Sequence, residues 1–222
     1  MQINWKLGDT SRKYEVGPNG GPGTVSTGKG DRGGSSYGTY QLSSKTGTCA
    51  QFVKTMGYSE YFGKNQPGSP LFTALWIKAV QKFPKFGEDQ HEFIRITHYQ
   101  VQMDYLSGIG IDLTTRGPAV QDAVWSTSVQ FGPATSLIEK SLRWKSVNKM
   151  NDEEIVTSIQ DYKIVNNSTL FRSSSDSVKK STLNRAKNEK ADLIKLATSG
   201  LDIVPDSIKN LFDVISDIGK DN

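Results

Sequence analysis

Two acidic residues, Glu15 and Asp31, stand sixteen positions apart in contrasting surroundings. Glu15 lies between a tyrosine and a valine at the expected end of a short helix. Apolar neighbours and the negative end of a helix dipole raise the pKa of a carboxyl group. Asp31 lies in the polar strip GKGDRGG beside Lys29 and Arg32, which keep it ionised. One protonated acid and one ionised carboxylate form the pair that glycoside hydrolysis requires.

The same glycine-rich segment offers a second chemistry, phosphate binding. GTVSTGK, from Gly23 to Lys29, matches most of a phosphate-binding loop. The next residue is Gly30, where Ser or Thr would hold Mg²⁺, and the polar residues before the segment cannot form the buried strand that such a loop follows. Phosphate binding is therefore disfavoured.

A metal site is disfavoured as well. His91 and His98 are the two histidines of the chain and stand seven residues apart. Metal ligands on one helix favour a spacing of three or four residues. The sequence therefore predicts no metal and no cofactor, and ordinary surface or hydrogen-bonded roles for both histidines.

Composition sets the class of protein. The chain has 222 residues, 35% of them hydrophobic and 23% charged, which is typical of a soluble globular protein. Its single cysteine, Cys49, excludes an intramolecular disulfide. The net charge of +4 suits an anionic polymer such as nucleic acid, teichoic acid or peptidoglycan, without choosing among them. The sequence contains no apolar run of about 18 residues, so it predicts no membrane anchor. No secretory signal is recognised.

The elements that must position the carboxylates follow from the pattern of residues. Residues 9–16 predict a short helix with Asp9 or Thr10 as N-cap. Residues 17–48 are too rich in glycine for a helix, but GTVST and SYGTYQL read as strands of a small bent sheet. From about residue 70 the periodicity is helical, with a stop at Gly132-Pro133 and a capping box at Asn151 and Glu154.

These elements predict an α+β fold that is predominantly α, with one catalytic domain over residues 1–200. A basic amphipathic helix is expected at 176–198. Residues 201–222 predict a C-terminal amphipathic helix, packed on the domain or appended to it, with five Asp against two Lys. Cationic helices are the usual membrane disruptors, so this acidic one is expected to pack on the body.

The segment KYEVGPNGGPGTVSTGKGDRGGSSYGTYQL resembles a lysozyme-superfamily domain of phage endolysins and tail proteins. The same domain is similar to the C-terminal muramidase or chitosanase-like module of some type VI secretion spike proteins. The family pattern runs almost unbroken from Tyr14 to Leu42, and weaker similarity extends the match to about residues 5–197. One departure is Val16, where the family commonly has Ser.

The resemblance implies a lysozyme-like fold, in which a helical lobe and a glycine-rich β-wing flank a cleft for a β-1,4-linked N-acetylated glycan. Glu15 aligns with the catalytic acid of the family and Asp31 with its second carboxylate. Further residues are implied to line the cleft: Ser36, Tyr37, Tyr40, Gln41, His98, Tyr99, Trp125, Ser126 and Gln130. Strand alternation assigns one of Tyr37 and Tyr40 to the core, and Trp125 also fits a buried helix.

The resemblance favours a phage endolysin, a muramidase that hydrolyses peptidoglycan strands. Such a protein is expected to be a monomer in the host bacterial cytoplasm that needs a holin for release to the periplasm, with no nucleic acid partner. Two alternatives stay open: a type VI or tail-associated antibacterial effector of the same chemistry, and a non-catalytic glycan-binding virion protein. The pattern leaves open peptidoglycan or chitosan preference, and retention or inversion at the anomeric carbon.

Overall fold

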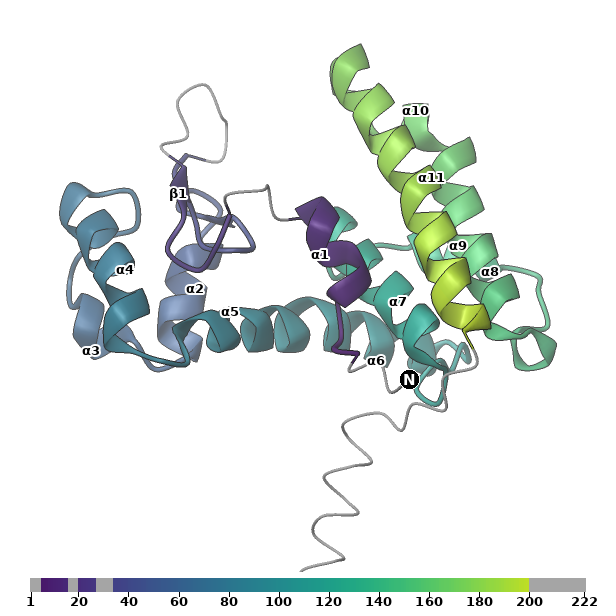
Figure 1. Ribbon diagram of the computed structural model, residues 1–222, viewed down its shortest axis with the longest axis horizontal. Coiled ribbons are helices and arrows are strands. Elements are labelled where there is room, and N and C mark those ends of the chain that lie inside the picture. Colours follow the sequence, from purple (N-terminus) through teal and green to yellow (C-terminus); the bar gives the residue numbers. More distant parts are fainter. Residues whose placement is uncertain (1–4, 16–19, 27–33, 200–222) are drawn as a thin grey trace, which may run out of the picture. The chain divides into compact units, whose positions relative to one another are not determined.

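The computed structural model describes residues 5–15, 20–26 and 34–199, which form two compact units (Figure 1). The middle unit comprises residues 12–101, and the terminal unit combines residues 1–11 with 102–222. Helices dominate both, and a single three-stranded sheet is described. The predicted α+β class, predominantly α, is confirmed. No helix within the described ranges is long and apolar enough to cross a membrane, and the C-terminal helix predicted at 201–222 lies outside those ranges.

The middle unit contains the sheet and the helices that follow it. Its strands are β1 (Val25–Ser26), β2 (Ser36–Tyr37) and β3 (Leu42–Ser43), in the order β1-β2-β3 with antiparallel pairing. Its helices are α2 (Thr48–Thr55), α3 (Ser59–Phe62), α4 (Pro70–Lys82), α5 (Phe86–Ile94) and the π-helix η1 (Arg95–Tyr99).

The segment SYGTYQL is a hairpin rather than the single strand that its alternation predicts. β2 and β3 pair Tyr37 with Leu42, and residues 38–41 form the turn between them. Gly38 has a φ of 74° and Gln41 a φ of 53°, both in the left-handed region. A regular strand cannot include such residues, so the parity argument that compared Tyr37 with Tyr40 does not apply across this turn.

An aromatic cluster forms the core of the middle unit. Phe62 stacks on Phe72 at 4.5 Å between ring centroids, and Trp76 meets Phe86 edge-to-face at 4.9 Å. Phe52 contacts both Trp76 and Phe86. Each aromatic pair adds about 0.5–1.5 kcal/mol beyond area burial. The cluster therefore gives the short sheet a rigid support.

The terminal unit consists of helices. They are α6 (Gln100–Gly108), α7 (Pro118–Phe131), α8 (Leu137–Leu142), the 3₁₀ turn η2 (Val147–Lys149), α9 (Asp152–Val165), α10 (Asn167–Leu170) and α11 (Asp176–Thr198). The chain begins this unit with the first residues of α1 (Asp9–Glu15). α9 and α11 lie side by side, and both pack against α7 (Figure 1).

Several helix boundaries agree with the sequence. Asn151 accepts from the backbone N–H of Glu154, while the Glu154 carboxylate accepts from the N–H of Asn151, so the predicted capping box is confirmed. α7 ends at Phe131 before Gly132, whose φ is 88°. α11 covers the predicted basic helix. These boundaries depend on local capping chemistry, which a sequence shows directly.

Candidate functional site

Glu15 is the last residue of α1, as the sequence predicts for the proton donor. Its partner in the expected carboxylate pair, Asp31, lies outside the described residues. Of the two residues, only Glu15 is therefore placed, by α1.

Asp122, which the sequence analysis did not single out, holds the start of α1. Its Oδ1 accepts from the N–H of Gly8 at 2.7 Å and its Oδ2 from the N–H of Thr10 at 2.9 Å. The first N–H groups of a helix have no partner within it, so this buried carboxylate acts as a cap from α7. Asp9 instead accepts from the backbone of Lys6, and the predicted N-cap at Asp9 or Thr10 is wrong.

Burial raises the pKa of Asp122 to about 6, against the hydrogen bonds from Thr10 and Gly8, which lower it. Gly8 has a φ of 86°, and a β-carbon there would lie 2.7 Å from Nε1 of Trp125. The residue that precedes α1 is therefore a glycine whose backbone lies directly against Trp125 of α7. The signal that could have identified Asp122 in the sequence is that it is the one charged residue in the segment AVQDAVW.

The structure separates the two tyrosines of the hairpin. Tyr37 is fully buried, and its hydroxyl accepts from the N–H of Gly68 at 2.8 Å and shares a hydrogen bond with Thr73. Its ring packs edge-to-face on Phe72. A ring in this position supports the sheet and does not face solvent.

Tyr40 and Gln41 occupy the turn itself. The Tyr40 hydroxyl lies 2.6 Å from Nδ1 of His91, which gives this histidine the hydrogen-bonded role expected of it. Gln41 is exposed and donates from Nε2 to the carbonyl of Gly38. Ser36 lies within β2 and is buried. Among the four hairpin residues, Tyr40 and Gln41 are therefore the ones with side chains that reach solvent.

Gln90 is a second residue that sequence reasoning missed. It is fully buried in α5, donates to the carbonyl of Pro22 at 3.0 Å and accepts from the N–H of Thr39 at 3.0 Å. Trp76 donates to the same Pro22 carbonyl. Gln90 thus ties the hairpin turn to the turn that precedes β1, and a single glutamine on a helix gives no signal of this in the sequence.

His98 and Tyr99 lie in the π-helix η1, and both are half-buried. Nδ1 of His98 lies 2.9 Å from the hydroxyl of Thr97, which donates to the carbonyl of Phe93. Burial lowers the pKa of His98, so the ring is neutral at pH 7. Short π-helical turns are frequent at functional sites, and a neutral imidazole can both donate and accept hydrogen bonds.

The three predicted residues of α7 differ in exposure. Trp125 and Ser126 are fully buried, and Ser126 Oγ accepts from Arg185 of α11 at 3.4 Å. Gln130 is half-buried. Trp125 therefore packs in the core of the terminal unit beside Gly8, and Gln130 is the α7 residue with a partly accessible side chain.

The structure brings the predicted residues together in two sets. Ser36, Tyr37, Tyr40, Gln41, His98 and Tyr99 belong to the middle unit, whereas Trp125, Ser126 and Gln130 belong to the terminal unit. Across the described part of the chain, no group of three His, Cys, Asp or Glu side chains is placed to hold a metal ion. The cleft between a helical lobe and a β-wing stays a prediction.

The family model described as type VI secretion system spike protein VgrG3-like, C-terminal, matches residues 7–190. The type VI secretion system spike protein VgrG3 of Vibrio cholerae is 41% identical over 203 residues, which are 90% of this chain and 20% of that protein. The chain therefore spans about a fifth of the length of this relative.

Two solved structures share the fold. The GH46 chitosanase of Gynuella sunshinyii in complex with chitotetraose aligns with a TM-score of 0.53 and 15% identity over 85% of both chains. A mutant chitosanase from Bacillus subtilis MY002, complexed with 6 GlcN, aligns with a TM-score of 0.55 and 14% identity over 84% of this chain and 83% of that one. At these identities the likeness concerns the fold alone, and it agrees with the predicted lysozyme-like architecture.

The expected localisation is wrong. The matching family and the Vibrio cholerae relative are type VI secretion spike proteins, which indicates secretion into target cells rather than retention in a host cytoplasm until lysis. The comparisons give no support to the expected need for a holin. The sequence analysis took both routes from one resemblance of the segment from Tyr14 to Leu42, so that resemblance could not separate them.

Proposed function

Because the chain belongs to the family of VgrG3-like C-terminal domains of type VI secretion spike proteins, we propose that it is an antibacterial effector domain. It hydrolyses β-1,4 glycosidic bonds of peptidoglycan in a target cell, as a muramidase with Glu15 as the general acid. This is the alternative that the sequence left open, and the comparisons lend the endolysin hypothesis no support.

The observation that carries the proposal is the position of Glu15 at the end of α1, within the residues that the family model matches. The helix is fixed at its start by a buried carboxylate and leads directly into the glycine-rich segment that contains Asp31. A proton donor must be held firmly relative to the scissile bond, and α1 supplies that support. Asp31 is the proposed second carboxylate, which attacks the sugar or activates water.

Accessible polar and aromatic side chains complete the proposed site. Tyr40 and Gln41 from the hairpin, with His98 and Tyr99 from η1, are the described residues proposed to contact the glycan from the middle unit. Gln130 is proposed to contact it from the terminal unit. Tyr37 and Trp125 support the site from the core, because both rings are buried.

The family to which the chain belongs indicates how the domain reaches a target cell. The relative of which this chain spans about a fifth is a spike protein, so we propose that the domain is carried by a type VI spike complex into the target cell. A free endolysin mechanism would instead need a separate membrane pore.

Chitosan hydrolysis is a second candidate, favoured by the fold that the chain shares with two chitosanases. The net charge of the chain disfavours chitosan as the substrate. Chitosan is a polymer of protonated amines at mildly acidic pH, whereas the chain carries a net charge of +4. Peptidoglycan presents carboxylates, which a positive protein attracts.

The test is the loss of turbidity of Gram-negative cells whose outer membrane has been stripped. Glu15→Gln should clear them about a thousandfold more slowly than wild type, since general acid catalysis contributes about 10²–10⁴-fold. Glu153→Gln is the matched control, because Glu153 is exposed in the first turn of α9. Circular dichroism establishes that each variant is folded.

Equal clearing by wild type and Glu15→Gln would contradict the role of Glu15. Clearing by neither would favour a non-catalytic glycan-binding role or another polymer, and chitosan is then the next substrate. With an active enzyme, the anomer first formed from a soluble peptidoglycan oligosaccharide reports retention or inversion. The carboxyl groups are about 5–5.5 Å apart in retaining enzymes and about 6.5–9.5 Å in inverting ones.

A further inference from the structure

Trp144, between α8 and η2, has features that the fold of the terminal unit does not account for. Its side chain is 94% exposed, and its φ is 65°. A bulky residue in the left-handed region is strained, and an exposed indole gains no burial in return. Residues held in such conformations cluster at ligand-binding sites.

One cationic side chain lies over this indole, and two more follow in the same loop. The guanidinium of Arg143 lies 5.6 Å from the centroid of the Trp144 ring, within the range of a cation–π interaction. Lys145 and Lys149 follow within the next five residues, and both are exposed. The loop from Arg143 to Lys149, here called the tryptophan loop, therefore combines one aromatic face with three positive charges.

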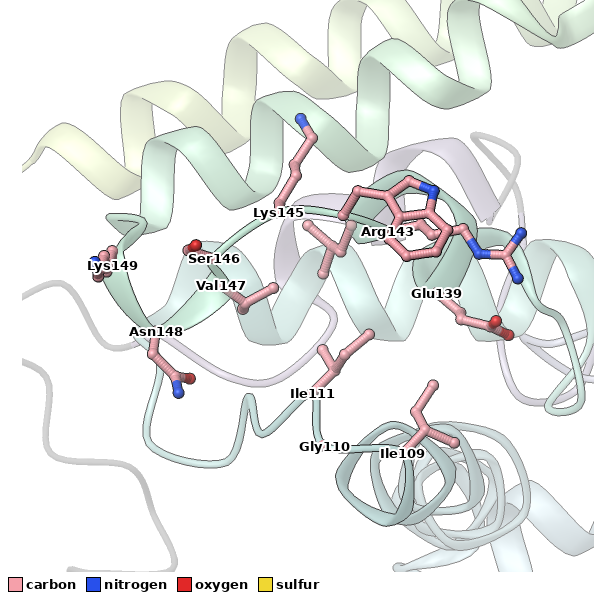
Figure 2. A pocket seen from close by; sticks show the side chains of 12 residues that line it. Ile109, Gly110, Ile111, Glu139, Arg143, Lys145, Ser146, Val147, Asn148 and Lys149 are labelled. Carbon is pink, nitrogen blue, oxygen red and sulfur yellow. The ribbon is translucent and has the colours of Figure 1, made fainter.

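A hollow of about 570 Å³ lies against the tryptophan loop. Figure 2 shows the loop on one side and Ile109 and Ile111, in the segment that follows α6, on the other. Glu139 is the acidic residue of its lining, and its carboxylate accepts from the hydroxyl of Tyr105 at 2.6 Å. The lining therefore offers apolar contact at one edge and a net positive charge at the other.

A second hollow of about 530 Å³ shares Lys145, Ser146 and Lys149 with the first. Lys145 donates to the hydroxyl of Ser158 at 2.8 Å, which anchors its ammonium group at the second hollow. The two hollows thus adjoin along one loop. Such a surface suits an extended chain with several repeating units rather than a single small molecule.

We propose that the tryptophan loop and its two hollows form a second, non-catalytic binding site for an acidic glycan strand. The indole of Trp144 stacks on the flat C–H face of a sugar, while Arg143 and Lys149 bind carboxylates attached to the strand. The inference rests on the proposed function, because the polymer bound at this second site is the peptidoglycan that the enzyme cleaves. A second contact on one polymer raises the effective concentration of the strand at the catalytic site.

The experiment measures cosedimentation of the full chain with purified peptidoglycan sacculi. All variants carry Glu15→Gln, so that the polymer is not consumed during the measurement. Trp144→Gly should weaken binding about tenfold, as expected for loss of an aromatic anchor. Its melting temperature should equal or exceed that of the parent, because glycine adopts this φ without strain. Trp144→Phe should retain most of the binding.

Charge is tested by the double variant Arg143→Ala/Lys149→Ala, which should also weaken binding and reduce its dependence on salt. Two matched controls are exposed residues of the same unit outside the loop: Val165→Ala for apolar loss and Lys180→Ala/Lys187→Ala for charge loss. Both controls should bind as the parent does.

Unchanged binding by folded Trp144→Gly would overturn the proposal, and so would an equal loss in the Lys180/Lys187 control. Binding of neutral N-acetylchitotetraose as strong as that of sacculi, at the same concentration of sugar, would overturn the requirement for acidic groups. The outcome is separable from that of the proposed function, since sacculus binding is measured without catalysis and clearing depends on Glu15.

Discussion

The carboxamide of Gln90 occupies the space that a side chain at Gly38 would need. A β-carbon at Gly38 would lie 2.3 Å from Oε1 of Gln90, and the φ of Gly38 is 74°. Gln90 is fully buried and holds Pro22 and Thr39 through hydrogen bonds. The turn that presents Tyr40 and Gln41 is thus built around a glycine and a glutamine that are 52 residues apart.

Gly38→Ala should destabilise the protein by about 2–4 kcal/mol, because left-handed strain adds to overpacking against Gln90. Gly47→Ala is the matched control. Its φ of 84° is also left-handed, but a β-carbon there meets no atom within 4 Å, so strain alone should cost about 1 kcal/mol. Urea unfolding measures both, and equal losses would contradict the packing argument.

Asp122 should make stability depend on pH between about 4 and 6. Its pKa is raised by burial from 3.8 to about 6 in the folded protein, so the folded state binds a proton more tightly than the unfolded one. The stabilisation is complete below pH 4 and is lost as the pH rises through 6. The change amounts to about 3 kcal/mol at about 1.4 kcal/mol per pKa unit.

Asp122→Asn should abolish this slope, because an amide does not titrate. The comparison is the difference in unfolding free energy between pH 4 and pH 7, for wild type and variant. The variant has two opposing effects on the unfolding free energy at any one pH. It loses an acceptor for one backbone N–H, and it removes a buried charge. The dependence on pH is therefore a clearer measure than the stability at one pH. An identical slope in the variant would show that another group titrates.

His98 should contribute a pH dependence of the opposite sign. Burial lowers its pKa below 6.5 in the folded protein, so acid protonates the unfolded state more readily. Its contribution is present above pH 6.5 and is lost as the pH falls through its lowered pKa. His98→Gln should therefore lose less stability than wild type between pH 7 and pH 5 in thermal unfolding. A larger loss in the variant would be inconsistent with a buried neutral imidazole.

Two ion pairs between α9 and α11 should differ in strength. Lys163 and Glu189 lie 3.5 Å apart, at 2% and 1% side-chain exposure, and Gln160 also donates to Glu189. Lys163→Met should cost about 3–5 kcal/mol, because it leaves a buried carboxylate without its cation, and adding Glu189→Leu should recover most of that loss.

The control is Lys190→Met, which removes the 2.6 Å pair with Asp161 between the same two helices. That pair is partly exposed, so its loss should cost about 0–1 kcal/mol. Calorimetric unfolding of the single and double variants separates the two pairs. A loss for Lys163→Met as small as that for Lys190→Met would refute the buried-pair argument.

The sequence predicted those parts of the fold that local chemistry controls. The capping box at Asn151, the end of α7 at Gly132 and the position of Glu15 at the end of a short helix all follow from residues within a few positions of one another. The family pattern around Glu15 was also visible in the sequence, since it consists of contiguous residues.

Contacts between distant segments required the tertiary structure. Asp122 caps a helix more than 110 residues away, Gln90 shapes the hairpin, and Tyr37 and Tyr40 separate into a buried and a partly exposed ring only because Gly38 and Gln41 turn the chain. Trp144 is not singled out by the sequence, and only the structure shows that its side chain lies in solvent. Residue type and spacing fix local hydrogen bonds, whereas the exposure of a side chain depends on which remote elements pack over it.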